Sequence, residues 1–179
     1  MVNELRNLPI KRIEGNIIAD DTFFDSQKRI KTWIKNPGAQ AYEAPLGALS
    51  LNFNTVKVYV SPGKKVGDRP IIVIEPKNEY IKLENNGQTL PSGKRRRLIV
   101  NRIGKENHDL ITVSGGINIG QLRAQYFLNI TNPIQYALNV FKSYIELSGI
   151  TFNGKLQKGK VPDGVLELYM HEGESPSCM

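Results

Sequence analysis

The chain has 179 residues, 40% of them hydrophobic, with a net charge of +7 and a sequence pI near 9.5. This length suits one ordinary domain or two small ones, and the composition excludes wholesale disorder as well as a membrane-spanning run of roughly 18 apolar residues. The charge favours polyanionic partners, namely nucleic acid, an acidic membrane surface or an anionic cell-wall polymer, without choosing among them.

The N-terminal third is expected to hold short elements. Residues 1–6 lack the apolar region of a signal peptide. Residues 13–18 predict a strand that is interrupted at Gly15 and closed by Asp20-Asp21. We expect these two aspartates to form a turn and not a catalytic carboxylate pair, because adjacent side chains at a strand end point to opposite sides. Residues 28–35 predict a short helix with Ile30, Trp33 and Ile34 on one side.

The middle of the chain predicts a series of strands separated by turn residues. Residues 55–60 alternate, with Val56, Val58 and Val60 on one face, as in a half-buried strand. Residues 71–74 are a short apolar run that suits a fully buried strand. Further strands are expected at residues 81–83, 98–100, 110–113 and 126–130. Together they indicate a small antiparallel sheet or sandwich.

A helix is predicted from Asn132-Pro133 to Gly149. Asn132 can cap the free amides, proline suits the first helical position, and Gly149 suits the left-handed residue that ends a helix. The apolar stripe comprises Ile134, Ala137, Leu138, Phe141, Tyr144 and Ile145.

Leu5 and Leu8 predict the last turns of a helix that ends at Pro9. Two similar segments follow this helix and the one that ends at Gly149. Residues 9–16 and 149–155 each turn at a Gly or Pro, place Ile next and enter a strand that contains Gly. They could pair in one sheet with the β-rich middle inserted between them. We therefore predict a β-rich α+β fold in which a small sheet or sandwich domain, residues 55–127, is nested in an αβ domain made of residues 1–54 and 128–179.

Several patterns resemble catalytic motifs, and each has a simpler interpretation. Ser61-Pro62-Gly63-Lys64 fits S-x-x-K, in which the lysine must sit one helical turn beyond the serine, but Pro62-Gly63 disfavours a helix there. Ser50-Leu51-Asn52 fits only the short S-x-N pattern, and Lys31-Thr32-Trp33 is not K-T-G. We therefore assign no catalytic residue.

Metal and cofactor sites are not expected either. His108 and His171 have no cysteine or carboxylate at ligand spacing, and Cys178 near the chain end is interpreted as an inert thiol. Residues 115–120 are glycine-rich but lack a phosphate-loop lysine and the dinucleotide glycine spacing, so a turn or bulge between strands is expected.

The densest basic run is Lys94-Arg95-Arg96-Arg97, with Arg102 and Lys105 nearby in sequence. These four side chains are the candidate binding residues for an anionic polymer. No aromatic interleaving or known nucleic-acid module accompanies them, so nucleic acid is the less favoured partner. The default interpretation of the run is a solvated hairpin edge, whose charge blocks pairing with other chains.

Four segments in order resemble the class C low-molecular-mass penicillin-binding proteins, which are D-alanyl-D-alanine carboxypeptidases with endopeptidase activity on peptidoglycan. The segments are residues 10–24 (IKRIEGNIIADDTFF), 42–54 (YEAPLGALSLNFN), 56–63 (VKVYVSPG) and 132–154, the last running from Asn132-Pro133 to Gly149-Ile150-Thr151-Phe152-Asn153-Gly154. In that family a large insertion, two accessory domains one inside the other, separates S-x-x-K from S-x-N and K-T-G.

The resemblance implies that this chain corresponds to the insertion. Residues 171–176 resemble the return into the catalytic domain. Implied partners are peptidoglycan or another cell-wall polymer and the catalytic domain of the same polypeptide, without metal or cofactor, in a periplasmic or other extracytoplasmic location. The chain alone is then expected to be inactive. An anionic-polymer binding module is the alternative function, and nucleic-acid binding is a more distant one.

Overall fold

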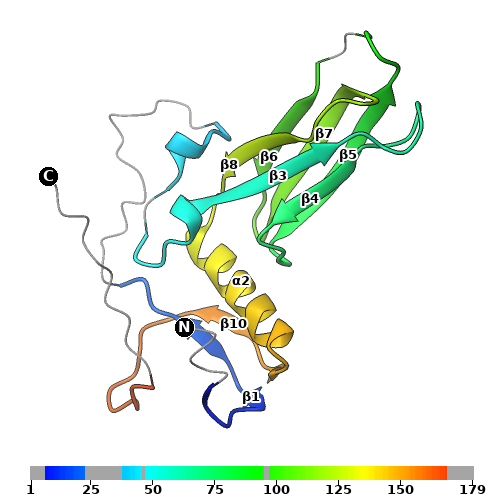
Figure 1. Cartoon of the computed structure of the whole chain (residues 1–179). Coiled ribbons are helices and arrows are strands. Elements are labelled where there is room, and N and C mark those ends of the chain that lie inside the picture. The colour runs from blue at the N-terminus through cyan, green and yellow to red at the C-terminus, as the bar shows by residue number, and fades with distance from the viewer. Residues whose placement is uncertain (1–6, 23–37, 46, 95–96, 169–179) are drawn as a thin grey trace, which may run out of the picture.

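The computed structural model of the chain describes residues 7–22, 38–45, 47–94 and 97–168. These residues form a β-sandwich at one end, a helix beneath it, and short paired strands on the other side of the helix (Figure 1). The expected helix at residues 28–35 lies outside the described residues. The β-rich α+β class predicted from the sequence is confirmed. Among the helices described, none is long and apolar enough to cross a membrane.

The sandwich consists of two three-stranded sheets. In the first, β3 (Thr55–Ser61) pairs antiparallel with β4 (Ile71–Glu75) and with β8 (Ala124–Asn129). In the second, β7 (Asp109–Asn118) lies between β5 (Ile81–Leu90) and β6 (Ile99–Gly104). The pairing of β7 with β6 is antiparallel, but its pairing with β5 is parallel. The purely antiparallel arrangement expected from the sequence is therefore wrong at this one pair. Strands β5 and β6 run in opposite directions because a turn joins them, so β7, which lies between them, must be parallel to one and antiparallel to the other.

The core lies between the two sheets. The alternation predicted for β3 is confirmed, because Val56, Val58 and Val60 are all fully buried. The prediction that residues 71–74 form a fully buried strand is wrong: Ile71 is 52% exposed and Val73 is 42% exposed. Strand β4 is an edge strand with one covered face, and its uniform apolar composition hides that alternation.

Helix α2 (Pro133–Leu147) confirms the predicted helix and both of its ends. The Asn132 side chain accepts a hydrogen bond from the backbone N–H of Gln135 at 3.3 Å, and Gly149 has φ +83°. The helix buries two faces. Ile134 and Leu138 pack with Ala19 in a small core, and Tyr136 and Val140 enter the sandwich core. The sequence stripe identified the first face and missed the second.

The two chain ends pair as parallel strands. Strand β1 (Arg12–Glu14) pairs with β9 (Thr151–Asn153), and β2 (Ile17–Ala19) pairs with β10 (Leu156–Lys158). The pairing expected between the two end segments is therefore present. The division into residues 1–54 plus 128–179 and residues 55–127 stays a prediction, and its second boundary falls inside β8.

Two single-turn helices precede the sandwich, η1 (Ala41–Glu43) and η2 (Asn52–Asn54). The turn expected at Asp20-Asp21 is also present. Asp20 accepts hydrogen bonds from the hydroxyl of Thr22 at 2.7 Å and from the backbone N–H groups of Val161 and Thr22, each at 2.8 Å. These bonds lower the pKa of Asp20 to about 2. Asp21 accepts from the backbone N–H of Ala48 at 2.8 Å.

A polar network joins the sandwich to helix α2. The guanidinium of Arg102 donates to the carbonyl of Gly38 at 3.0 Å, to the hydroxyl of Thr131 at 2.9 Å, and to both the carbonyl and the side chain of Asn129. The buried carboxylate of Asp109 accepts from the backbone N–H of Thr131 at 2.7 Å. Strands β6, β7 and β8 are thus tied to the residues that lead into the helix.

The pairing of the chain ends should depend on glycine at position 154. A Cβ added there would lie 1.7 Å from the carbonyl oxygen of Gly15, so Gly154→Ala must push the two paired segments apart. We expect a loss of about 2 kcal/mol in the free energy of unfolding, measured by urea titration with circular dichroism. The control, Asn153→Ala on an exposed position of β9, should stay within about 0.5 kcal/mol of the parent chain. Equal effects of the two changes would contradict the close approach.

The Asp20 turn predicts a specific acid sensitivity. Because the folded pKa of Asp20 lies below its ordinary value of 3.8, its carboxylate stabilises the fold above that value, and this contribution is lost as pH falls toward about 2. Asp20→Asn should therefore lower stability at neutral pH and flatten the dependence of the urea midpoint on pH between about 5 and 2. Asp163→Asn, which removes an exposed carboxylate, serves as the control. An Asp20→Asn variant that keeps the parent pH profile would rule the interpretation out.

Candidate functional site: the basic tip of the sandwich

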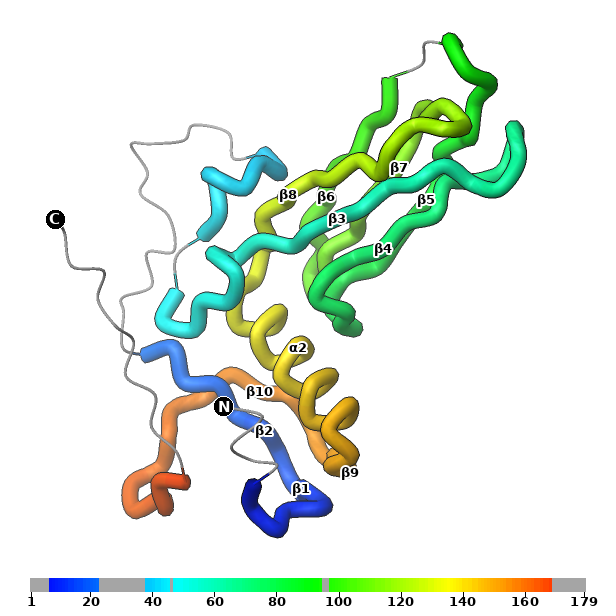
Figure 2. Tube along the Cα trace, viewed as in Figure 1, coloured from blue at the N-terminus to red at the C-terminus, as the bar shows by residue number. Residues whose placement is uncertain are grey.

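Three loops meet at the end of the sandwich remote from helix α2. Strands β3, β5 and β7 all run away from the helix, so the loops that follow them, residues 62–70, 91–98 and 119–123, lie at one extremity (Figure 2). Backbone hydrogen bonds join the first and third of these loops to the end of β5. The N–H of Gly67 donates to the carbonyl of Thr89 at 2.8 Å, and the N–H of Ile119 donates to that of Leu90 at 2.8 Å. We call the described residues of these loops the basic tip.

The basic tip gathers positive charge from all three loops. In the described residues its basic side chains are Lys64, Lys65, Arg69, Lys94, Arg97 and Arg123, and its single acidic one is Asp68. Within the part of the chain that the structure describes, none of these six cations forms an ion pair. Asp68 instead caps its own loop by accepting from the N–H of Lys65 at 2.9 Å.

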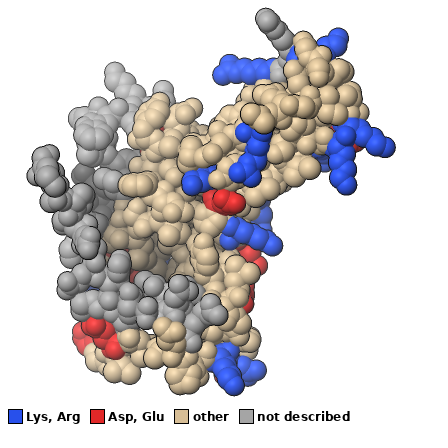
Figure 3. All heavy atoms as spheres, in the orientation of Figure 1, with Lys and Arg blue, Asp and Glu red and all other residues tan. Residues whose placement is uncertain are grey.

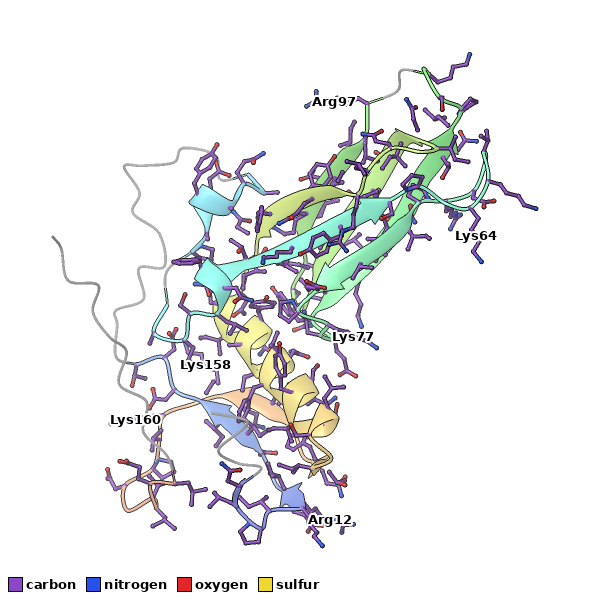
Figure 4. The ribbon with its side chains drawn as sticks, viewed as in Figure 1. Arg12, Lys64, Lys77, Arg97, Lys158 and Lys160 are labelled. Carbon is purple, nitrogen blue, oxygen red and sulfur yellow. The ribbon has the colours of Figure 1, made fainter. Side chains whose placement is uncertain are left out.

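The charge of the whole chain resides in this part of the sequence. Residues 55–127 contain 13 of the 24 Lys and Arg and 6 of the 17 Asp and Glu, so they account for the entire excess of +7. Lys and Arg side chains are prominent around the far end of the sandwich in the space-filling view (Figure 3). Lys64 and Arg97 extend from different sides of that end (Figure 4).

The basic run predicted from the sequence is only one part of this surface. Lys94 and Arg97 are exposed in the loop between β5 and β6, and Arg95 and Arg96 lie outside the described residues. The assignment of Lys94, Arg95, Arg96 and Arg97 as a polymer-binding site stays a prediction. Sequence reasoning missed Lys64, Lys65 and Arg69, although the turn residues around them place them in an exposed loop.

Two cations counted with the run are not part of the tip. Arg102 points toward the helix side of the sandwich, where it is held in the network with Asn129 and Gly38. Lys105 lies in the turn between β6 and β7, at the opposite end of the sandwich, and its N–H donates to the carbonyl of His108 at 2.9 Å. Nearness in sequence is misleading here, because β6 runs back toward helix α2.

Arg123 has a defined position at the tip. Its guanidinium lies over the ring of Tyr59 on β3, 3.9 Å from the ring centre. Further along the same outer face, the ammonium of Lys57 lies 5.8 Å from the ring centre of Phe127. Such cation–π contacts orient the charges without neutralising them. The positive surface therefore continues from the tip onto this face of the first sheet.

The base of the 91–98 loop is fixed by a glycine in β7. Gly115 has φ +84°, and a Cβ at this position would lie 1.8 Å from the carbonyl oxygen of Arg97. Residues 115–118 of the glycine-rich run therefore belong to the strand, and the turn begins only at Ile119. The expectation that the whole run lies between strands is wrong, because the close approach of a neighbouring chain segment requires glycine inside a strand.

The residues that resemble catalytic motifs do not come together. Ser61 is the last residue of β3, and the N–H of Gly63 donates to the hydroxyl of Thr89 at 2.8 Å, so residues 61–64 form no helical turn. The expectation that Pro62-Gly63 prevents a helix here is confirmed, and the assignment of no catalytic residue stays a prediction. The segment 31–33, His171 and Cys178 lie outside the described residues, within which no three His, Cys, Asp or Glu side chains form a metal cluster.

An apolar cavity of about 490 Å³ lies between β2, residues 48–51 and helix α2. Its walls include Ile17, Leu49, Leu138 and Phe141. The one carboxylate among its lining residues is Asp20, whose oxygens already accept the turn hydrogen bonds. Ser50 also lines the cavity and is exposed, but no hydrogen bond joins its hydroxyl to Asp20 in the described residues.

The fold and the tip together define a β-sandwich that presents a cationic end and is mounted on a small αβ unit. The sequence matches the model of the D-Ala-D-Ala carboxypeptidase 3 (S13) family over residues 1–174. The chain therefore belongs to this family, and the resemblance to low-molecular-mass penicillin-binding proteins is confirmed.

The relatives that the chain resembles are longer proteins. It is 26% identical over 168 residues to the D-alanyl-D-alanine carboxypeptidase of Actinomadura sp. (strain R39), covering 90% of this chain and 31% of that protein. Penicillin binding protein 4 from Haemophilus influenzae has a similar fold, with a TM-score of 0.68 and 22% identity over 93% of this chain and 36% of its own. Its complex with a β-lactam superposes with a TM-score of 0.55 and 18% identity over 93% of this chain and 34% of its own. The chain thus spans about a third of these relatives.

The glycine at the base of the tip generates a stability prediction. Gly115→Ala adds a side chain where both the positive φ and the carbonyl of Arg97 oppose it, and we expect a loss of about 3 kcal/mol in the free energy of unfolding. Gly93→Ala is the matched control, because Gly93 also has a positive φ but open space around its Cβ, and it should cost about 1 kcal/mol. Equal losses in urea titrations of the two variants would show that the contact with Arg97 is not close.

Proposed function

We propose that this chain is a non-catalytic accessory part of a serine-type D-alanyl-D-alanine carboxypeptidase or endopeptidase that acts in peptidoglycan remodelling. Membership of the S13 family supports the connection to this class of enzyme. The coverage of 31% of the Actinomadura enzyme supports the proposal that the rest of such an enzyme, including its reacting groups, is encoded outside these residues.

The observation that carries the proposal is the geometry of the single S-x-x-K sequence. Acyl transfer to a serine needs a base within hydrogen-bond reach, and in this family pattern a helical turn brings the lysine back to the serine. Here Ser61 ends a strand, and Pro62-Gly63 leads the chain outward to the exposed Lys64. Lys64 lies in a bend and is exposed, so no helical turn carries its ammonium back to the hydroxyl of Ser61.

The partners follow from the same proposal. The catalytic domain of the same polypeptide would contact the αβ part, and the parent enzyme would act on the peptide of peptidoglycan without a metal or cofactor. Such an enzyme works outside the cytoplasm, so we propose a periplasmic or other extracytoplasmic location. The contribution of this chain is positional, because it supplies a rigid sandwich with a charged end.

The proposal predicts that the purified chain does not react with penicillin. A fluorescent penicillin incubated with the folded chain should leave no covalent label after denaturing electrophoresis, because no described serine has a base beside it. Circular dichroism of the same sample establishes that the chain is folded.

Two controls make this experiment decisive. An active penicillin-binding protein incubated in parallel shows that the reagent labels a competent serine. The variant Ser61→Ala identifies the origin of any label. Covalent labelling of the parent chain that disappears in Ser61→Ala would overturn the proposal, and the absence of label in both supports it.

A further inference from the structure

Two hydrophobic side chains are exposed among the cations of the basic tip. Leu122, in the loop between β7 and β8, is 88% exposed, and Val66, in the loop between β3 and β4, is 50% exposed. Neither belongs to a hydrophobic cluster of the described residues. Both are therefore available to a partner, and they lie in loops that also carry Lys64, Lys65 and Arg123.

The position of the tip suits contact with an extended surface. Strands β5 and β7 each contain ten residues, so they hold the tip roughly 30 Å beyond the helix side of the sandwich. The tip lies at the extremity of the described chain, away from β1 and β10 (Figure 2). A flat surface can therefore touch all three loops without meeting the αβ part.

The combination of charge and exposed apolar groups discriminates between classes of polyanion. A soluble phosphate polymer neutralises the cations but leaves Leu122 in water. Single-stranded nucleic acid is gripped by aromatic stacking, and the described residues of the three loops contain no Phe, Tyr or Trp. An anionic bilayer provides phosphates at its surface and an apolar layer just beneath, so it satisfies both kinds of side chain.

We propose that the basic tip binds the surface of an anionic lipid bilayer. Leu122 and Val66 enter the boundary between headgroups and acyl chains, and the cations of the three loops contact the lipid phosphates. Binding of this kind is peripheral and reversible, and it weakens with salt because the charges remain solvent-accessible. This property goes beyond the proposed accessory role, and it does not depend on the presence or absence of a reactive serine.

The test is co-sedimentation of the 179-residue chain with vesicles. Vesicles of phosphatidylcholine with about a third of phosphatidylglycerol should bind the chain, pure phosphatidylcholine should not, and binding should fall as salt rises from about 0.05 to 0.5 M. The double variant Lys64→Ala/Lys65→Ala should bind at least about 20-fold more weakly, because each surface cation near an anionic membrane contributes about fivefold. Leu122→Ala should bind about tenfold more weakly.

Each variant has a matched control at an exposed position outside the tip. Leu166→Ala, at a leucine that is 82% exposed, and Lys155→Ala/Lys160→Ala, at two exposed lysines, should bind vesicles like the parent chain. The circular dichroism spectrum and urea midpoint of every variant are compared with the parent, so that loss of binding is read only from folded protein. Val66→Ala provides a second apolar test should Leu122→Ala unfold.

Soluble poly(glycerol phosphate), the chemistry of an anionic wall polymer, is the competing ligand. At equal phosphate concentration it should displace the chain from vesicles only weakly. Tighter binding to the polymer than to the vesicles overturns the bilayer proposal and assigns the tip to a wall polymer. Vesicle binding that is unchanged in both Leu122→Ala and Val66→Ala also overturns it, because no apolar side chain then enters the bilayer. No binding to either ligand would overturn an anion-binding role altogether. The penicillin-labelling result is independent of all these outcomes.

Discussion

The burial of helix α2 on two sides is the constraint on which the rest of the structure depends. Its Tyr136 is fully buried in the sandwich core, where it meets the ring of Tyr80 edge to face at 6.3 Å and donates a hydrogen bond to the carbonyl of Thr55 at 3.1 Å. Burial raises the pKa of the Tyr136 hydroxyl, so it stays a neutral donor. On the adjoining face, Ile134 and Leu138 pack with Ala19 from the paired chain ends. One helix therefore belongs to both cores, and neither can move away without exposing it.

The polar network at the end of the sandwich fixes the orientation of the sandwich relative to helix α2. Hydrophobic contact alone tolerates sliding, whereas the bonds of Arg102 to Gly38, Thr131 and Asn129 have fixed geometry. Asp109 adds a buried carboxylate that accepts from the N–H of Thr131, and burial together with the charge of Asp109 raises the pKa of Tyr80. Asn129 and Asp109 are fully buried, so breaking a bond to either side chain leaves a buried polar group unpaired. The axis of the sandwich, and with it the direction of the basic tip, is thereby set relative to the helix.

The sequence predicted those features whose signal is local. The alternating valines of β3 and the capped ends of α2 follow from residue spacing, and the pairing of the chain ends followed from two similar short segments. The sequence-based predictions failed for features that depend on the tertiary arrangement. The apolar run of β4 does not show that this strand lies at the edge of its sheet. No local pattern indicates that β7 pairs in parallel with β5. The candidate site was found only in part for the same reason. Lys64, Lys94 and Arg123 are about thirty residues apart in sequence and share one surface only because three strands run in the same direction.

The distribution of charge separates the scaffold from the surface that it presents. Buried apolar residues and the hydrogen bonds of Arg102 stabilise the junction between the sandwich and helix α2. The six described cations of the tip, in contrast, form no ion pair within the described chain. Mutual repulsion among them costs stability, and burial elsewhere must offset that cost. The scaffold also constrains the tip. Because Gly115 in β7 has no side chain, the loop that carries Lys94 and Arg97 can approach this strand closely. The proposed binding of an anionic surface rests on this charge, because such a surface would supply the counter-charge that the described chain does not.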